Sequence, residues 1–587
     1  MLEVVKENCL GRITSFQSGC LDLSTPEILY ISGKGVEPPS FARAFISDGS
    51  CPPEGAKNII DLLPSRFFER APRLDTGIDP GFRGAEPAQS AYEKDLPTVF
   101  SSIEFGTAGD IVPVGDALLL SREPKRFAHF FSNLRERLGP GKLVYAPGAA
   151  DPLNLALLCY FGIDLVDPHG TMVRSSLGQV IMNGRIIQSG SQELERVVGI
   201  GKEPDRGAIL KHNLRQLESE LAIVRDAIRE GTLRHLVELR ARHAAWMVEA
   251  LRFADLEEYR SFERWTPTFG GPFLASSKES LWRPEIRRYR ERIETRYLPP
   301  SSPEVLLLIP CSARKPYSLS KTHKMFREAV RNSGIASSIQ EVIVTSPLGI
   351  VPRELETVYP AQQYDIPVTG HWDEDEKNII KHMLRWLLSK RKYSHIVAHI
   401  DDEWEFLGEM LEKAGAVHTG GESVTKKENL DKLTEMLRSL GGDISKPGWN
   451  QRTAEEIRAM ASYQFGEAYE SLLEGAEVRG GYPMVRVLKG GMQLCSLVPD
   501  KGSLSLTLDG GKALARSGKF GVEIDDFVPK TNVFSIGVTS ASDEIRSGDE
   551  VYVHHGGEVR AVGTARMNGA SMVALKRGEA VHIRHHG

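Results

Sequence analysis

The chain has 587 residues, too many for a single hydrophobic core, and at about 150 residues per domain this length predicts three to five domains. Its 41% hydrophobic and 26% charged residues are ordinary for a globular protein, and a net charge of −5 does not by itself indicate a nucleic-acid binder. The six cysteines are scattered without a C-x-x-C pair, no apolar run reaches the ~18 residues of a bilayer span, and the first residues lack a signal-peptide pattern. These observations argue against a disulfide framework, a cysteine-rich metal site and a membrane protein, so we expect a soluble cytoplasmic protein.

Residues 1–195 mix short apolar strands with turns that contain Gly and Pro. Within them, KLVYAPGAADPLNLALLCYFGIDLVD at 142–167 has the pattern strand, turn, helix, strand, which predicts an α/β unit. Residues 206–253 are predicted to be helical, because apolar residues from Leu217 to Ile228 recur at steps of three or four.

A polar, Arg-rich stretch with prolines at 277–303 predicts a domain boundary, and a second α/β block follows at 304–441. Continuous apolar strands alternate there with amphipathic helices, which predicts a largely parallel sheet. The expected strands are VLLLIP (305–310), EVIVTS (341–346) and HIVAHI (395–400), and the expected helices cover 321–334, 373–390 and 403–415. A turn-rich linker at 445–450 leads to a small α+β segment and then to a β-rich module with Gly-Asp and Asn-Gly turns.

The most reactive stretch of the chain follows the first strand of this block. The strand VLLLIP should place Cys311 at its carboxyl end, the edge at which open α/β sheets bind ligands. A helix N-terminus shortly after it, together with Arg314 and Lys315, is expected to lower the pKa of the thiol. His323, with the hydroxyls of Tyr317 and Ser320, could then handle protons beside an activated nucleophile. The alternative is that Cys311 is only a small buried apolar residue.

The motif, PCSARKPYSLSKTH at 310–323, resembles the signature of archaeosine synthase, a paralogue of archaeal tRNA-guanine transglycosylase. SPLGIVPRELETVYPAQQYDIPVTGHW at 346–372 and IRSGDEVYV at 545–553 resemble the same family. The resemblance implies an archaeal enzyme that acts on tRNA carrying 7-cyano-7-deazaguanine at position 15 of the D-loop. The nitrile becomes an amidine: a Cys311 thiolate adds to give a thioimide, and an amine then displaces the sulfur. Asp365, His371 and His323 are the candidate proton-transfer groups.

The nitrogen donor has two interpretations. In the first, which we favour, free lysine joins the nitrile carbon through its side-chain nitrogen, and a radical SAM partner enzyme cleaves the adduct to archaeosine. In the second, ammonia from glutamine gives archaeosine directly, but the sequence contains no second well-placed cysteine for glutamine hydrolysis. Lys315 or Arg353 could bind the lysine carboxylate, and Glu354 or Asp373 its α-ammonium. The candidate substrate-binding residues are Lys315, Tyr317, Ser320, Arg353, Glu354 and Asp373. No phosphate-binding G-x-x-x-x-G-K-[ST] loop is present, so neither ATP nor another cofactor is implied.

The first 280 residues resemble the transglycosylase catalytic domain, a TIM barrel with a helical zinc subdomain. Asp164 and Asp167 match the region of its aspartate nucleophile, but the turn after them differs, so we expect Asp167 to cap a strand end and the barrel not to exchange bases. The stretch that matches the zinc cluster, 197–213, contains His212 and no cysteine, so we expect no metal and helices held by packing alone.

Residues 519–587 resemble a PUA domain, a small β-barrel that commonly binds RNA. Basic residues here would contact tRNA phosphates, although a solvated charged surface is the alternative. The candidate RNA-binding residues are Arg560, Arg566, Lys576, Arg577 and Arg584.

The predicted fold is therefore multidomain α/β. A degenerate TIM-barrel, transglycosylase-like domain covers 1–280, with its helical former zinc subdomain at about 197–280. An α/β domain with the cysteine motif follows at 281–445, then a small α+β domain at 446–518 and the PUA domain at 519–587. The transglycosylase resemblance also suggests a homodimer. Two other functions compete with the amidine-forming enzyme: an active transglycosylase that uses Asp167, and a non-catalytic tRNA-binding paralogue.

Overall fold

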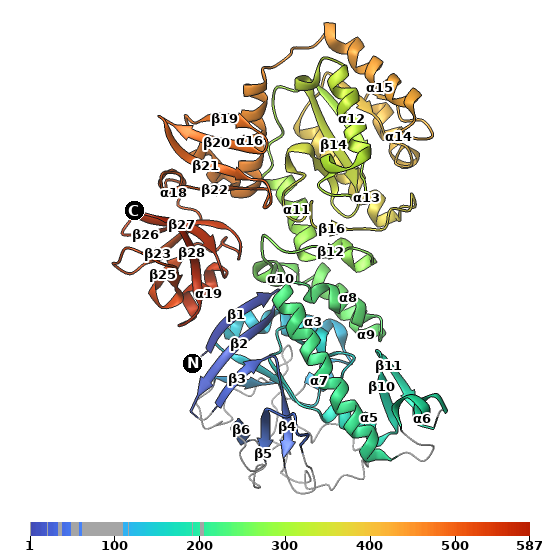
Figure 1. Cartoon of the computed structure of the whole chain (residues 1–587), viewed down its shortest axis with the longest axis vertical. Coiled ribbons are helices and arrows are strands. Elements are labelled where there is room, and N and C mark those ends of the chain that lie inside the picture. The colour runs from blue at the N-terminus through green and yellow to red at the C-terminus, as the bar shows by residue number, and fades with distance from the viewer. Residues whose placement is uncertain are drawn as a thin grey trace. The chain divides into compact units, whose positions relative to one another are not determined.

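The chain forms two compact units (Figure 1). The N-terminal unit contains Met1–Thr266, Phe534–Ile536 and Ala570–Ala580, and the C-terminal unit contains Pro267–Val533, Gly537–Gly569 and Val581–Gly587. A computed structural model describes residues 2–19, 21–32, 38–47, 58–61, 110–114, 117–190, 192–199 and 205–587. Cys20, Cys51, residues 62–109 of the predicted barrel and residues 200–204 of the former zinc stretch lie outside the described residues.

Parallel strands form the main sheet of the N-terminal unit, in the order β6-β5-β4-β9-β8-β7. Their bounds are Ile59–Asp61, Ala44–Ser47, Glu27–Ser32, Leu165–Val166, Leu143–Ala146 and Ile111–Pro113. An antiparallel sheet of β1 (Leu2–Asn8), β2 (Gly11–Ser18) and β3 (Leu21–Thr25) accompanies them. Over the described ranges the parallel sheet is a half-barrel, and closure into a TIM barrel remains a prediction.

Helices and one hairpin complete this unit. The helices are α2 (Ala117–Leu120), α3 (Pro124–Leu138), α4 (Leu155–Tyr160), α5 (His169–Ser176), α6 (Gln192–Val198), α7 (Arg206–Glu230), α8 (Leu233–Ala241), α9 (Ala245–Leu256) and α10 (Tyr259–Trp265), and the hairpin is β10 (Gln179–Met182) with β11 (Arg185–Gln188). The predicted helical region at 206–253 is confirmed as α7, α8 and most of α9. Its periodic residues from Leu217 to Ile228 are fully buried, because one face of α7 packs into the core. The predicted strand, helix and strand at 142–167 are confirmed as β8, α4 and β9.

The C-terminal unit contains a central sheet in the order β15-β14-β13-β17-β18. The strands are β13 (Val305–Pro310), β14 (Ile339–Thr345), β15 (Gly349–Pro352), β17 (His395–Ala398) and β18 (Ala416–His418). All neighbours pair in parallel except β14 and β15, which confirms the largely parallel sheet. β13 is the middle strand and every residue in it is buried, as its apolar sequence VLLLIP predicts.

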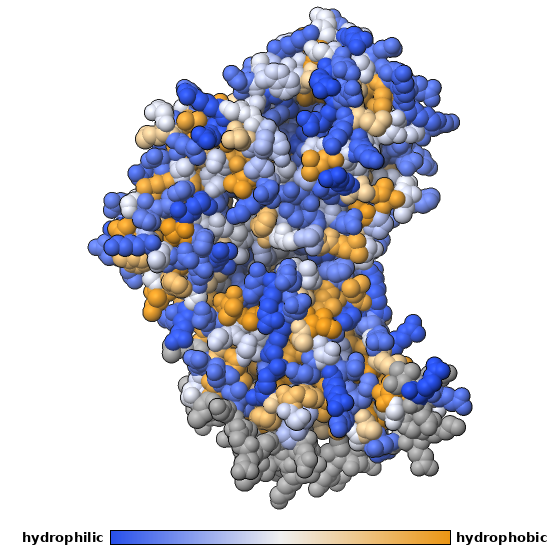
Figure 2. Space-filling view, viewed as in Figure 1, coloured by the Kyte–Doolittle hydropathy of each residue, from blue (hydrophilic) through white to orange (hydrophobic). Residues whose placement is uncertain are grey.

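The central sheet is accompanied by amphipathic helices. They are α11 (Pro284–Thr295), α12 (Lys321–Asn332), α13 (Glu374–Lys390), α14 (Trp404–Lys413) and α15 (Lys427–Ser439), and a short parallel pair, β12 (Phe273–Leu274) with β16 (Tyr364–Asp365), adjoins them. Their leucines are buried, as at Leu407 and Leu411 of α14 and at Leu433 and Leu437 of α15. Figure 2 shows mainly hydrophilic residues on the surface over α14 and α15, as expected for the solvent-facing side of amphipathic helices.

Two smaller modules follow in the chain (Figure 1). The first combines α16 (Trp449–Phe465), α17 (Tyr469–Leu473) and α18 (Leu508–Ala515) with an antiparallel sheet of β19 (Glu477–Gly481), β20 (Met484–Lys489), β21 (Met492–Val498) and β22 (Ser503–Leu506). The second is a mixed sheet in the order β24-β28-β27-β26-β23-β25 with helix α19 (Gly569–Ala574). Its strands are β23 (Gly521–Ile524), β24 (Val533–Phe534), β25 (Val538–Ala541), β26 (Glu550–His555), β27 (Glu558–Ala565) and β28 (Glu579–His586). Within the described ranges, no helix has both the length and the apolar character to cross a bilayer.

Candidate active site

Cys311 directly follows β13, at the carboxyl end of the middle strand of the central sheet. The neighbouring parallel strands end beside it: β14 ends at Thr345, and β17 runs into the loop that reaches Glu403. Three strand ends therefore converge on the thiol, which is the arrangement expected where open α/β sheets bind ligands.

A cluster of hydroxyl groups adjoins the thiol. The Thr345 hydroxyl lies 2.7 Å from the Tyr364 hydroxyl, and the Tyr317 and Tyr364 hydroxyls lie 2.5 Å apart. Both tyrosines are buried, and burial raises their pKa well above the usual value, so they stay neutral hydrogen-bonding groups. The Thr345 side chain also hydrogen-bonds to the Cys311 thiol and favours its thiolate.

The side-chain amine of Lys315 is buried beside these hydroxyl groups. Its Nζ lies 4.1 Å from the ring centroid of Tyr364 and, among the residues that the structure describes, has no hydrogen-bond partner. Burial lowers the pKa of Lys315, while the charges of Cys311 and Asp365 act in the opposite direction. A buried amine with no hydrogen-bond partner is costly, so its donors are available to a bound substrate.

The expected lowering of the thiol pKa was wrong. Burial raises the pKa of Cys311 to about 11, and the negative charge of Glu403 adds to this effect. Lys315 acts in the expected direction, but more weakly than burial. The resting group is therefore a thiol, and it must lose its proton when it reacts.

Glu403 is a site residue that the sequence reasoning missed. It lies in the loop after β17, is only 4% exposed, and its Oε2 has no hydrogen-bond partner in the described part of the chain. Burial raises the pKa of its carboxyl to about 8, with further contributions from the charges of Asp401 and Asp402. The available signal was the acidic run that directly follows the predicted strand HIVAHI, since adjacent parallel strands end at one edge.

His323 is fully buried in α12 and belongs to a structural ion-pair network. Its Nδ1 accepts a hydrogen bond from Nη2 of Arg353 at 2.9 Å. Arg353 also pairs with Glu341 at 2.6 Å and with Glu356 at 2.9 Å. Burial and the Arg353 charge lower the pKa of His323 to about 2, so its imidazole stays neutral at physiological pH. The structure thus occupies Arg353 and Nδ1 of His323 with internal partners, whereas Nε2 of His323 has no hydrogen-bond partner among the described residues, and its role in proton transfer stays a prediction.

Three other candidates have structural partners too. Ser320 is the N-cap of α12 and accepts a hydrogen bond from the backbone N–H of His323, and Asp373 caps α13 in the same way through Glu376. Glu354 accepts a hydrogen bond from the Tyr297 hydroxyl at 2.6 Å. Their expected contacts with substrate remain predictions.

Asp365 and His371 are exposed and lie on the segment around β16. The charge of Asp365 raises the pKa of Lys315, so this carboxylate lies near the side chains around Cys311. The backbone beside His371 approaches the loop after β17: a Cβ on Gly370 would lie 2.6 Å from Oδ2 of Asp402. Both residues therefore remain candidates for proton transfer, and of the predicted set the structure brings Lys315, Tyr317 and Asp365 together around Cys311.

Most of the chain is similar to known proteins. The archaeosine synthase subunit alpha of Methanosarcina acetivorans is 37% identical over 90% of this chain and 88% of its own length. The archaeosine synthase of Haloferax volcanii is 34% identical over 91% of each chain. The chain belongs to the archaeosine synthase family. The resemblance inferred from the motif at 310–323 is thereby confirmed.

Domain models and a more distant relative extend this assignment. A domain of unknown function (DUF5591) matches residues 286–437, the patch-forming domain C2 of tRNA-guanine transglycosylase matches 455–520, and the PUA domain matches 522–587. The tRNA-guanine(15) transglycosylase of Methanothermobacter thermautotrophicus is 25% identical over 83% of this chain and 72% of its own length. This member of the archaeosine synthase family is therefore transglycosylase-like, with a C-terminal PUA domain.

In the transglycosylase-like part, Asp167 is completely engaged. It is fully buried, and its oxygens accept hydrogen bonds from the Tyr145 hydroxyl at 2.8 Å and from the backbone N–H groups of Gly148 at 2.7 Å and His169 at 2.8 Å. Asp164 is likewise paired with Arg12 and Arg135. These contacts fit the expected role of Asp167 as a strand-end cap, and they hold Asp164 in a buried ion-pair network.

In the stretch predicted to match the zinc cluster, His212 hydrogen-bonds to the backbone. Nε2 of His212 lies 2.9 Å from the carbonyl oxygen of Ile181 in β10. Among the described residues, no group of three or more His, Cys, Asp or Glu side chains is placed to hold a metal ion.

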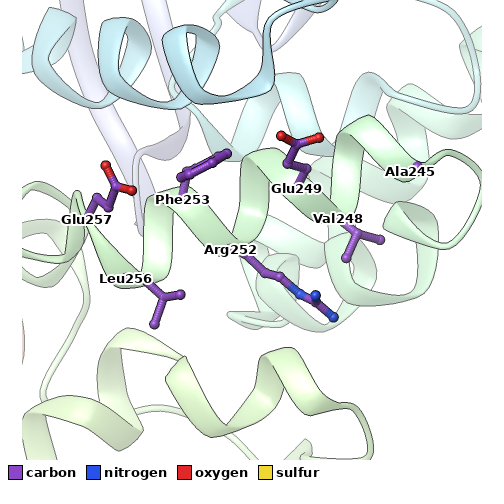
Figure 3. Close-up of a pocket in the computed structure, with 7 residues that line it drawn as sticks. All are labelled: Ala245, Val248, Glu249, Arg252, Phe253, Leu256 and Glu257. Carbon is purple, nitrogen blue, oxygen red and sulfur yellow. The ribbon is translucent and has the colours of Figure 1, made fainter.

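A surface hollow in the N-terminal unit carries no comparable chemistry. It is lined by one face of α9 and the residue after it, as Figure 3 shows: Ala245, Val248, Glu249, Arg252, Phe253, Leu256 and Glu257. No thiol or hydroxyl lines it, whereas the strand-end cluster in the C-terminal unit contains a thiol, a carboxyl and an amine. The strand-end cluster around Cys311 is therefore the candidate active site.

In the PUA domain, the five basic candidates differ in their surroundings. Arg560 pairs with Asp526 at 2.8 Å, and Arg584 pairs with Glu550 of the domain's own sheet at 3.0 Å. Arg566, Lys576 and Arg577 are exposed. Lys576 and Arg577 are better placed for phosphate contacts than Arg560 and Arg584, which would have to leave their carboxylates.

Proposed function

We propose that this chain acts in archaeosine biosynthesis on tRNA, and that Cys311 forms a covalent thioimide with the nitrile of 7-cyano-7-deazaguanine at position 15. The observation that carries the proposal is a thiol at three converging strand ends beside a buried amine, Lys315, that has no hydrogen-bond partner among the described residues. Membership of the archaeosine synthase family supports the substrate, and the PUA domain supports binding to tRNA.

The first step joins Cys311 to the base. Sγ bonds to the nitrile carbon, one π bond of the nitrile breaks, and the proton of the thiol ends on the nitrile nitrogen. The thiol pKa of about 11 means that the proton has to be removed as sulfur attacks. Lys315 and Thr345 favour the thiolate and therefore stabilise the attacking form.

The second step transfers the donor. The neutral side-chain amine of lysine adds to the thioimide carbon, the carbon–sulfur bond breaks, and the sulfur recovers a proton. The lysine ammonium must first lose a proton, and Asp365 and His371 are the exposed groups on the adjoining segment that could accept it. The product is a tRNA-bound amidine that carries the whole amino acid, which a radical SAM partner enzyme would then cleave to archaeosine.

The structure constrains the predicted donor-binding residues to different degrees. A contact of the lysine substrate with Arg353 would require it to leave Glu341 or Glu356, whereas Glu354 keeps Oε2 without a hydrogen-bond partner among the described residues. We therefore propose that Lys315 is the main residue that binds the donor, and that the buried Tyr317 lines the site. The homodimer suggested by the transglycosylase relatives remains a prediction.

The test is intact-mass analysis of nitrile-bearing tRNA after separate incubations with lysine, glutamine and ammonium. We expect lysine to give a product heavier by the whole amino acid, and ornithine to react more slowly because its nitrogen is one methylene further from the thioimide carbon. Direct amidine formation from glutamine or ammonium would contradict the lysine donor but not the thioimide. Guanine exchange into unmodified tRNA would instead indicate a transglycosylase, and tRNA affinity with no chemistry a binding paralogue.

A further inference from the structure

The carboxyl group of Glu403 is buried, and one of its oxygens is available to a reacting group. Its carboxyl is buried in the loop after β17, and Oε2 has no hydrogen-bond partner anywhere in the described ranges. Backbone hydrogen bonds at Asp401 and Glu403 replace part of the hydration that burial removes, but Oε2 stays without a partner, which costs stability. The same chain satisfies Asp167 with three hydrogen bonds, so the open position at Glu403 is a local feature.

The loop that carries Glu403 is held firmly from the side of β18. The carbonyl oxygen of Ile400 accepts a hydrogen bond from Nε2 of His418 at 2.8 Å, and a Cβ on Gly420 would lie 1.9 Å from that oxygen. The rings of Trp404 and His418 stack with centroids 4.0 Å apart and an interplanar angle of 6°. Glycine is thus required at 420, and the backbone on both sides of Glu403 is fixed.

The parallel pairing of two strands brings Glu403 and the thiol to the same edge of the sheet. β13 and β17 pair in parallel from Val305 to Leu308, so the residues that follow both strands lie at the same edge. The negative charge of Glu403 is the largest cause, after burial, of the raised pKa of Cys311. The segment that carries His371 also approaches this loop, since the rings of Trp372 and Phe406 lie 5.7 Å apart.

We infer that Glu403 is the catalytic residue that transfers protons in both steps at Cys311. This inference rests on the proposed function. In the first step the Glu403 carboxylate takes the thiol proton as sulfur bonds to the nitrile carbon, and returns it to the nitrile nitrogen, so the carboxylate is regenerated. In the second step it takes a proton from the attacking amine and gives it to sulfur as the carbon–sulfur bond breaks. No further reactant is needed, and each step balances.

The titration of Glu403 suits this role. Its pKa of about 8 provides both acid and base forms near neutral pH, which is the condition for efficient proton transfer. The charges that act on Glu403 are those of Asp401 and Asp402 from its own loop, and the charge of Glu403 acts on the Cys311 thiol, on which Lys315 acts in the opposite direction. Because the folded-state pKa is raised, the carboxylate appears only as the pH rises through about 8.

The experiment measures the single-turnover rate of thioimide formation on nitrile-bearing tRNA, from pH 6 to pH 10, with the full-length protein. Glu403→Gln keeps the size of the side chain but cannot accept a proton. We expect it to slow the reaction about 100-fold or more, and to remove the rise in rate near pH 8. Glu403→Asp should recover part of the rate together with the rise. The matched control is Glu405→Gln, an exposed acid two residues away, which should react like the wild type.

The possible results separate this inference from the proposed function. A Glu403→Gln variant within twofold of the wild type at every pH would overturn the role of Glu403 and leave the thioimide intact. If Glu403→Gln does not fold, Glu403→Asp decides, and a profile without the rise near pH 8 would overturn the inference. A folded wild-type protein that binds the tRNA but forms no thioimide would contradict the proposed function, and the inference with it.

Discussion

The N-terminal and central parallel sheets both place reactive side chains where their strands end, but those side chains differ in their partners. In the N-terminal sheet, Asp167 follows β9 and each of its oxygens accepts a hydrogen bond. In the central sheet, Cys311 follows β13 beside Lys315 and Glu403, whose Nζ and Oε2 have no hydrogen-bond partner in the described residues. The same sheet edge is thus used for structure in one unit and left open for chemistry in the other.

This difference shows how a transglycosylase-like chain can carry a new activity. A buried polar group without a partner costs stability, so it persists where a substrate completes its hydrogen bonds. In the transglycosylase-like part, Asp167 offers no such opening, because both of its oxygens accept hydrogen bonds. The α/β domain, matched by the domain of unknown function, supplies it instead at Cys311.

The largest effect should come from Cys311→Ser, which keeps the shape of the side chain but loses the thiolate. We expect no detectable modification of nitrile-bearing tRNA, because a hydroxyl is a much weaker nucleophile than a thiolate at neutral pH. Melting temperature and tRNA affinity should match the wild type, and intact-mass analysis of the tRNA reads out the reaction. Retained turnover would show that Cys311 is not the nucleophile, and the central sheet edge would then have no more claim to catalysis than the N-terminal one.

Arg353→Met should mainly destabilise the fold. It leaves Glu341 and Glu356 without their cation in a mostly buried network, which costs roughly 3–5 kcal/mol. Urea denaturation measures this loss, and the triple variant with Glu341→Gln and Glu356→Gln should recover part of it. A higher KM for lysine at unchanged stability would instead support the substrate-binding role predicted from the sequence.

Asp167→Ala tests the other sheet edge. It removes the acceptor for the Tyr145 hydroxyl and for two backbone N–H groups, so we expect a loss of about 1–3 kcal/mol in the free energy of unfolding. The rate of tRNA modification by the folded protein should change less than about twofold, as expected for a residue outside the chemistry. A severe loss of rate in a stable Asp167→Ala protein would show that the N-terminal sheet edge takes part in the reaction.

The smallest effect should come from the exposed basic pair Lys576 and Arg577. Replacing both by Ala should weaken tRNA binding, and the slope of log Kd against log salt should fall by about 1 for each phosphate that the variant no longer neutralises. Fluorescence titration over a range of salt concentrations measures both quantities. Unchanged affinity and slope would place the phosphate-binding residues elsewhere.

Much of the fold was predictable, because it depends on apolar periodicity. The continuous apolar strand VLLLIP predicted the buried middle strand, and the spacing from Leu217 to Ile228 predicted α7. Cys311 was predictable as well, since a reactive motif directly follows that strand. Closure of the N-terminal barrel remains a prediction, because residues 62–109 lie outside the described residues.

The electrostatics of the site were harder to predict. Neighbouring cations suggested an acidic thiol at Cys311, but burial depends on tertiary packing and raises its pKa instead. Glu403 was missed because it is 92 positions from Cys311, and only the parallel pairing of β13 with β17 brings the two together. Local sequence likewise could not show that Arg353 is occupied by Glu341 and Glu356.

The central claim is that Cys311 bonds covalently to the nitrile carbon. The most direct measurement is mass spectrometry of the protein after incubation with nitrile-bearing tRNA and nuclease, without any amine donor, so that the thioimide cannot be resolved. The proposed mechanism predicts one modified base attached to the peptide that contains Cys311, and release of the adduct when lysine is added. An unmodified Cys311 peptide, in a protein that still converts the same tRNA when lysine is present, would contradict it.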